Sequence, residues 1–143
     1  MGSGVTFEGR TLLGGTASGR AVILDEPLSF WGGFDPETGT VIDRRHPQAG
    51  ASLTGRILVM PSGRGSSSSS SVLAEAIRAG TAPAGIVLAE ADGIVVLGAL
   101  VARELYGTAL PVVALSGDDY SQIAAGDPVA VRGTVVTVGR PEV

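Results

Sequence analysis

The stretch RILVMPSGRGSSSSSSVLAEAIRAG, residues 56–80, decides the fold. Residues 56–60 are Arg56 followed by four apolar residues, and Pro61 closes the run, a pattern typical of a buried strand. Apolar side chains then recur at helical spacing in residues 70–79, and Gly80 ends that pattern. A turn rich in glycine and serine separates the two runs. The stretch therefore predicts a strand, a turn and a helix, the repeating unit of an α/β fold.

The same signals recur on both sides of this stretch. Short apolar runs predict further strands at residues 20–24, 85–89 and 111–115. Helices are expected at residues 94–106 and 118–125, the second capped by Asp118. Near the end, a hairpin is expected from runs at residues 129–131 and 135–138. The centre thus alternates strand and helix, which favours a parallel inner sheet, and the flanking strands add an antiparallel layer.

Composition excludes several classes of function. The chain has 143 residues, 44 % of them apolar, which predicts one domain spanning residues 1–143. The lack of cysteine excludes disulfides and thiolate metal ligands, and one histidine, His46, cannot build a zinc or haem site alone. Lysine is also absent, so a phosphate-loop or Schiff-base lysine is excluded. The net charge of −4 makes nucleic acid an unexpected partner.

No targeting segment and no bilayer-spanning run is visible in the sequence. Residues 1–4 lack a basic region followed by an apolar core. The longest apolar run, residues 94–102, is far shorter than the roughly 20 residues that cross a bilayer. We therefore expect a cytoplasmic protein that does not bind membranes.

The serine-rich turn is the sharpest candidate for chemistry. Several serines stand at or just before the predicted helix N-terminus, where unpaired N–H groups and the helix dipole attract anions. A serine hydroxyl there can bind a carboxylate or phosphate, or it can be stabilised as an alkoxide and act as a base. Arg64 can bring a fixed positive charge into the same turn. The alternative is simple N-capping within a flexible serine turn.

Residues 25–55 form a second candidate region, with few regular signals but several aromatic side chains. Phe30, Trp31 and Phe34 group around two glycines. They can fold over the domain's own core or form a partner surface, and both alternatives stay open. The pattern Asp-Pro-Glu-Thr-Gly at residues 35–39 predicts a tight turn.

His46 lies in the sequence DRRHPQAG of the same region. A single histidine followed by proline is expected to be a structural or surface residue rather than a catalytic one. Residues 43–45 are expected to form a solvated, ion-paired edge.

Taken together and in this order, the two regions resemble a known family. The sequence LSFWGGFDPETGTVIDRRHPQAGASLTGRILVMPSGRGSSSSSSVLAEAIRAGTAPAGIVL, residues 28–88, closely resembles the small subunit of the aconitase X dehydratases. The resemblance implies an α/β fold of the swivelling β/β/α type, like the mobile domain of aconitases. It also implies an aconitase X large subunit that holds the iron or iron–sulfur cluster, with none bound by this chain alone.

The resemblance also assigns roles within the turn. The aconitase family places a serine base in a Gly-Ser-Ser turn, and the matching residue here is Ser66, directly after Gly65. Ser67 matches the next position, which binds substrate or positions the backbone, and Arg64 is the nearest candidate for the cation. These four residues are thus expected to bind a small carboxylate substrate. Ser69→Ala and Ser70→Ala are expected to reduce turnover much less than Ser66→Ala.

Functions of two other classes are alternatives to this one. Residues 101–138 are similar to the tail of mobile phosphohistidine carrier domains, which share the swivelling fold. The stretch that would hold their histidine, residues 96–99, contains none, so the carrier function is rejected. A non-catalytic module whose serine turn only holds an anion stays open.

The family implies two reactions, the dehydration of cis-3-hydroxy-L-proline, mainly in bacteria, and that of mevalonate 5-phosphate, in archaea. The serine run and the WGGFD and DRRHP stretches are more similar to the bacterial type, since the archaeal type tends to have tyrosine and valine at Trp31 and Phe34. A phosphate would need an extra cation, and the turn offers only Arg64. We therefore expect conversion of cis-3-hydroxy-L-proline to pyrroline-2-carboxylate, with the mevalonate 5-phosphate dehydratase small subunit as the alternative.

Overall fold

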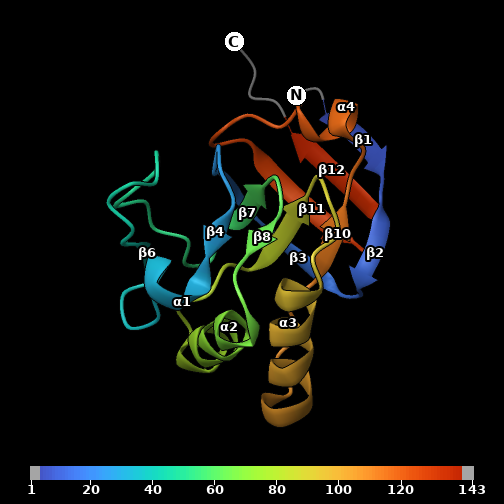
Figure 1. The fold of residues 1–143 in the computed structure, drawn as a ribbon. Helices are drawn as coiled ribbons and strands as arrows, with labels where there is room; N and C mark the ends of the chain where they lie inside the picture. The colour runs from blue at the N-terminus through green and yellow to red at the C-terminus, as the bar shows by residue number, and fades with distance from the viewer. Residues whose placement is uncertain (1–3, 140–143) are drawn as a thin grey trace.

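Strands dominate the computed structural model, which describes residues 4–139 (Figure 1). Within these residues, eight strands are joined in one sheet in the order β1-β12-β11-β3-β7-β9-β10-β2. Their bounds are β1 Gly4–Glu8, β2 Arg10–Leu13, β3 Thr16–Ile23, β7 Ile57–Met60, β9 Gly85–Leu88, β10 Val112–Ala114, β11 Pro128–Arg132 and β12 Val135–Gly139. The helices that follow the parallel strands are α2 Ser67–Ala79, α3 Gly93–Tyr106 and the short α4 Gly117–Tyr120.

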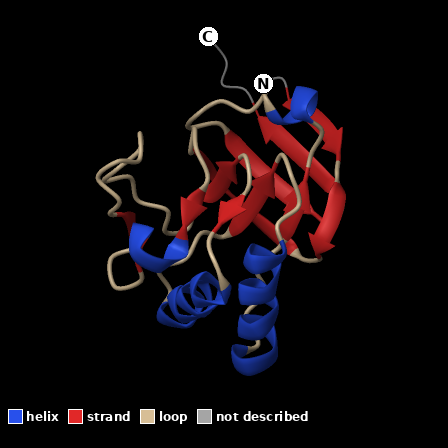
Figure 2. Cartoon of the chain, in the orientation of Figure 1, coloured by secondary structure: helices blue, strands red, loops and turns tan. Residues whose placement is uncertain are grey.

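The long strand β3 divides this sheet into two layers. Its first half, residues 16–20, pairs antiparallel with β11, and residues 21–23 pair parallel with β7. The parallel layer continues through β9 and β10, while β11, β12 and β1 form the antiparallel layer. Helices α2 and α3 lie side by side and cover the outer face of the parallel layer (Figures 1 and 2). The chain therefore has the β/β/α architecture that the resemblance implied.

Alternation along the parallel strands separates two hydrophobic cores. In β7, Ile57 and Val59 face the antiparallel layer, whereas Leu58 and Met60 face the helices. The neighbouring strand β9 alternates in the same way. Because successive side chains of a strand point to opposite faces, both strands are buried along their whole length. This explains why they appear in the sequence as continuous apolar runs.

Most of the predicted elements are present, with shifted ends. Helix α2 begins at Ser67 rather than residue 70, and β3 begins at Thr16 rather than residue 20. The expected helix at 118–125 is shorter, and its N-cap is Ser116, whose hydroxyl accepts from the backbone N–H of Asp119; Asp118 is not the cap. Strands β1 and β2 were not predicted: β1 alternates over only five residues and buries one side chain, and β2 buries none and does not alternate.

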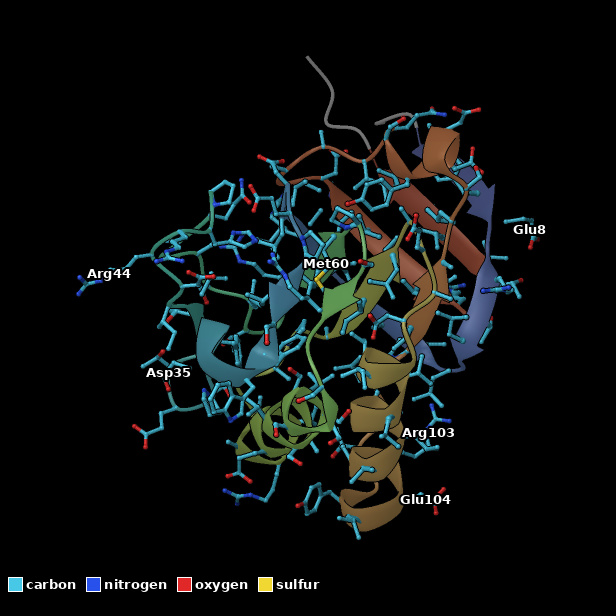
Figure 3. The ribbon with its side chains drawn as sticks, viewed as in Figure 1. Glu8, Asp35, Arg44, Met60, Arg103 and Glu104 are labelled. Atoms are coloured by element: carbon cyan, nitrogen blue, oxygen red, sulfur yellow. The ribbon has the colours of Figure 1, made fainter. Side chains whose placement is uncertain are left out.

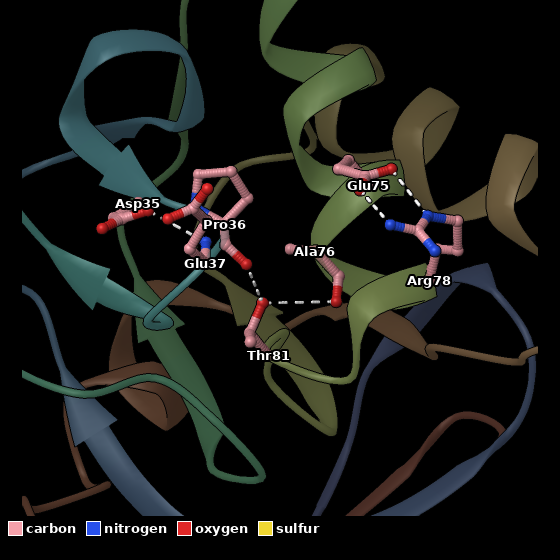
Figure 4. Close-up of polar contacts among 7 residues, drawn as sticks. All are labelled: Asp35, Pro36, Glu37, Glu75, Ala76, Arg78 and Thr81. Carbon is pink, nitrogen blue, oxygen red and sulfur yellow. Dashed lines mark hydrogen bonds and ion pairs between the residues drawn. The ribbon is translucent and has the colours of Figure 1, made fainter.

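Residues 28–41 contain short elements instead of a long helix or strand. These are β4 Leu28–Ser29, α1 Phe30–Gly33, β5 Phe34–Asp35 and β6 Thr40–Val41, together with β8 Gly63–Arg64, which pairs parallel with β4. The predicted turn at residues 35–39 is confirmed, since the backbone N–H of Gly39 donates to the carbonyl of Asp35 at 2.8 Å. Thr81 anchors this turn to the end of α2 by donating to the carbonyl of Pro36 at 2.6 Å (Figure 4).

None of the helices in residues 4–139 is long and apolar enough to span a membrane.

Replacement of Met60 by alanine tests the core beneath the helices. Met60 is 0 % exposed and lies inside the molecule (Figure 3), so Met60→Ala should lower the free energy of unfolding by about 2–5 kcal/mol. Leu105, 67 % exposed on α3, is the matched control, and Leu105→Ala should change it by less than about 0.5 kcal/mol. Urea denaturation measures both variants. Equal losses would contradict this division between core and surface.

Candidate functional site

The serine-rich turn lies where β7 ends and α2 begins. Strand β9 leads in the same direction into α3, and the first turns of the two helices are in contact. The hydroxyl of Ser70 donates to the carbonyl of Ile94 at 2.8 Å, which joins them directly. Two helix N-termini therefore meet at the carboxyl edge of the parallel strands, the edge where α/β sheets bind ligands.

Ser66 is the N-cap of α2. Its backbone is extended, with φ −113° and ψ −171°, and its Oγ accepts from the backbone N–H of Ser68 at 3.4 Å. The residue is exposed, so this hydroxyl is accessible to a ligand. The N–H contact and the positive end of the helix dipole both favour negative charge on Oγ.

The two neighbouring helix N-termini differ in charge. Asp92 caps α3, and its Oδ1 accepts from the backbone N–H groups of Ile94 and Val95 at 2.9 and 3.0 Å. A carboxylate of the chain itself therefore already occupies that end. Helix α2 has a neutral cap, and its first turn contains no acidic residue. Of the two ends, the N-terminus of α2 is the one at which an external anion meets no charge repulsion from the cap.

The other predicted site residues surround Ser66 in the turn. Arg64, Gly65 and Ser67 are all exposed. The guanidinium of Arg64 donates to the carbonyl of Pro27 at 2.9 Å, so this cation is held against the segment before β4. Gly65 has φ +116°, a conformation that residues with a Cβ atom rarely adopt. The structure therefore places the four predicted residues together, on one exposed turn.

The serines of the six-serine run differ in their exposure to solvent. Ser66, Ser67 and Ser68 are exposed, but Ser69 and Ser70 are buried. Prediction from the sequence missed this because it started the helix at residue 70. The signal was present: Leu73 is an apolar residue of the buried helix face, and the positions three and four residues before it belong to the same face.

The aromatic residues of α1 and β5 divide between core and surface. Phe30 and Phe34 are buried, and their rings pack edge to face with centroids 5.2 Å apart. Trp31 lies between them in the sequence but is 64 % exposed. The backbone of Trp31 is nonetheless tied to α2, because its N–H donates to the Oγ of Ser69 at 3.3 Å. Phe30 and Phe34 thus fold over the domain's own core, whereas Trp31 is left on the surface, where its role in binding a partner stays a prediction.

His46 is a buried structural residue. Its Nδ1 accepts from the backbone N–H of Gln48 at 3.0 Å, which leaves Nε2 to donate to the carbonyl of Glu26, also at 3.0 Å. Both ring nitrogens are therefore engaged. The ion-paired edge expected beside it is absent from residues 43–45, which the structure describes: Arg44 and Arg45 are exposed, and Asp43 instead accepts from the backbone N–H of Arg45.

Tyr120 is a further titratable residue near the carboxyl edge of the sheet. Its partial burial, together with the negative charge of Asp25, raises the pKa of Tyr120 to about 12. The phenol is therefore protonated at neutral pH and is a poor general base.

The described residues provide no metal site. Across residues 4–139, no group of three or more His, Cys, Asp or Glu side chains is arranged to hold a metal ion. The turn instead offers a hydroxyl, backbone N–H groups and a guanidinium, which suit an anionic ligand.

A family model and a solved structure that match this chain agree on the family. Residues 6–138 match the family described as Aconitase X swivel domain. The crystal structure of aconitase X from Thermococcus kodakaraensis, in its holo-form, superimposes with a TM-score of 0.83 at 36 % identity, covering 94 % of this chain and 98 % of the other.

Two kinds of curated relative match the chain. Cis-3-hydroxy-L-proline dehydratase from Pseudomonas aeruginosa is 52 % identical over 116 residues, which cover 81 % of this chain and 20 % of that protein. The small subunit of phosphomevalonate dehydratase from Methanosarcina mazei is 37 % identical over 131 residues, which cover 91 % of this chain and 87 % of the subunit. The chain thus spans about a fifth of the length of the first relative and most of the second.

Alanine substitutions distinguish the exposed aromatic from its buried neighbour. Trp31→Ala should change the free energy of unfolding by less than about 1 kcal/mol, because little of the indole is buried. Phe30→Ala should lower it by about 3–5 kcal/mol, because that ring lies in the core. Urea unfolding of both variants provides the comparison. A loss of several kcal/mol for Trp31→Ala would assign the indole to the core.

Proposed function

This chain belongs to the Aconitase X swivel domain family, and we propose that it supplies the serine base of a hydro-lyase whose remaining machinery lies in a larger component. One observation carries the proposal: the exposed hydroxyl of Ser66 caps α2 at the junction of two helix N-termini. We further propose that residues 1–143 act as one swivel domain. The cytoplasmic location expected from the sequence stays a prediction.

The proposed larger component is an aconitase X large subunit. The Methanosarcina relative is named as a small subunit, which implies a larger partner, and the Pseudomonas relative is about five times as long as the matched region. The proposal does not depend on whether the larger component is a separate chain. In either arrangement the exposed serine turn of this chain forms one side of a shared site.

In the proposed mechanism Ser66 removes the proton next to the substrate carboxylate. Its Oγ, as an alkoxide stabilised by the helix N-terminus, takes this proton from carbon 2. The electron pair of the broken C–H bond forms the carbon–carbon double bond, and the bond from carbon 3 to the hydroxyl oxygen breaks. The departing hydroxyl needs a proton to leave as water, and we assign that proton donor to the larger component.

Neighbouring residues of the turn are proposed to bind the substrate. The hydroxyl of Ser67 and the backbone N–H groups that follow Gly65 point to binding of a carboxylate at the end of α2. Arg64 is the candidate cation, already anchored at Pro27. These contacts would hold carbon 2 of the substrate close to Ser66, which is the geometric condition for proton transfer.

The iron or iron–sulfur cluster that the family implies does not fit the residues of this chain. The sequence has no cysteine, and residues 4–139 contain no cluster of potential ligands. We therefore place that group in the larger component and derive no step through it.

We propose cis-3-hydroxy-L-proline as the substrate, on the higher identity to the Pseudomonas dehydratase. In this compound the hydroxyl and the carboxylate lie on one ring face, and the proton on carbon 2 lies on the other. Elimination is therefore anti, and a base on a mobile domain can approach from the face opposite the leaving group. The competing candidate is mevalonate 5-phosphate, supported by the 37 % identity to the Methanosarcina subunit.

Replacement of Ser66 by alanine tests the proposed base. With the larger component present, Ser66→Ala should reduce turnover roughly 10²–10⁴-fold, the usual effect of losing a general base. Ser68→Ala is the matched control, because Ser68 is also exposed and its backbone N–H remains. Gel filtration should show the assembly intact for both variants. Equal activity of the two variants would remove Ser66 from the mechanism.

Turnover of the candidate substrates tests the proposed reaction. The assembled enzyme should convert cis-3-hydroxy-L-proline to pyrroline-2-carboxylate. The enamine formed first, with its double bond between carbons 2 and 3, becomes the imine when the ring nitrogen loses a proton and carbon 3 gains one, and an imine-trapping reagent detects that form. The trans isomer, in which the proton and the hydroxyl lie on the same face, should not react. Efficient turnover of mevalonate 5-phosphate, with none of the imino acid, would overturn the choice of substrate. If this chain instead binds small carboxylates but no turnover appears with any large component, it is a non-catalytic anion-binding module.

A further inference from the structure

Ser69 is the most deeply buried serine of the six-serine run, at 1 % exposed. Its Oγ is in contact with two separate segments. From the loop before the turn, the backbone N–H of Trp31 donates to it at 3.3 Å, and the hydroxyl of Ser29 lies 3.2 Å away. From the turn itself, the carbonyl of Arg64 lies 3.5 Å away and accepts a weak bond. One buried hydroxyl therefore joins the Trp31 loop to the serine turn.

Gly65 packs directly against this hydroxyl pair. A Cβ atom at Gly65 would lie 2.4 Å from the Oγ of Ser69 and 2.9 Å from the Oγ of Ser29, closer than side-chain carbons approach. The residue immediately before Ser66 is therefore in contact with both hydroxyls. Gly65 also has φ +116°, so both its backbone conformation and this close approach require a residue without a Cβ atom.

Backbone pairing joins the same two segments. Ser29 is in parallel register with Arg64, and Leu28 with Gly63. The hydroxyl of Ser29 also donates to the carbonyl of Trp31 at 2.9 Å, which closes the loop on itself. The loop and the turn thus form one hydrogen-bonded unit with the Oγ of Ser69 at its centre.

We propose that Ser69 is a positioning residue that sets the location of the Ser66 hydroxyl and couples it to the exposed Trp31 loop. The proposal rests on the proposed function for the role of Ser66. It replaces the mild effect that the sequence predicted for Ser69→Ala, because the structure buries this hydroxyl between the two segments. Ser69 itself is buried and acts through Gly65, without touching the substrate.

Kinetics of the assembled enzyme give the first test. Ser69→Ala should lower kcat roughly 10–100-fold, as expected when a reacting group is displaced by about 1 Å, while KM changes less than about threefold. Ser69→Thr keeps an Oγ atom and should recover most of the lost kcat. Ser68→Ala, on the exposed side of the same helical turn, should behave as the unmodified enzyme. An unchanged kcat for Ser69→Ala, with the assembly intact, would overturn the proposal.

Tryptophan fluorescence gives a second readout that does not depend on the reaction. Trp31 is the single tryptophan of this chain, so its emission reports on the loop. Ser69→Ala should change the emission maximum or the quenching by acrylamide, and Ser68→Ala should change neither. Unchanged Trp31 emission in a folded Ser69→Ala chain would refute the coupling. If Ser66→Ala stays active, the proposed base fails, while the fluorescence still decides whether Ser69 joins the two segments.

Ser29→Ala covers the case in which the Ser69 variants fail to fold. It removes the partner hydroxyl and should lower kcat in the same direction. Where Ser69→Ala does fold, the double variant should lose less than the product of the two single losses, because contacting residues are not additive. An unchanged kcat for Ser29→Ala, or losses that multiply independently, would contradict a shared hydroxyl pair.

Discussion

Burial of β7 and β9 on both faces is the constraint on which the rest of the structure depends. Each strand supplies side chains to two cores, so the antiparallel layer and the helical layer must both be present to cover them. The end of β7 is consequently fixed in space, and the chain continues from it through β8 into α2. The position of the serine turn follows from this packing rather than from the turn sequence.

The chemistry of the turn depends on a difference between two adjacent helix ends. The N-terminus of α3 is capped by Asp92, whereas α2 is capped by the neutral hydroxyl of Ser66. Of the two ends, only that of α2 presents no negative charge from its cap to an anion. The same turn is exposed, which leaves its hydroxyl and N–H groups accessible to a ligand. That arrangement agrees with a domain that works against a larger component.

The loop from residue 28 to residue 41 gains its order from contacts outside itself. Phe30 and Phe34 enter the core beneath the helices, and Thr81 holds the turn at Pro36 (Figure 4). These anchors leave Trp31 exposed on a loop whose backbone is bonded to Ser69. A large apolar side chain presented on a fixed backbone suits recognition of a partner, because little conformational freedom is lost on binding.

The sequence by itself determined the order of the central strands and helices, and it identified the serine turn after β7. Those features depend on local patterns: apolar runs, helical periodicity, and the stop at Gly80. It did not reveal β1 and β2, which are short and bury one side chain between them, nor the division of the serines into exposed and buried members. Only the tertiary structure decided that Ser69 contacts Ser29, because those residues are brought together by the pairing of β4 with β8. Contacts between segments 40 residues apart depend on how the layers pack, and local sequence patterns do not contain that information.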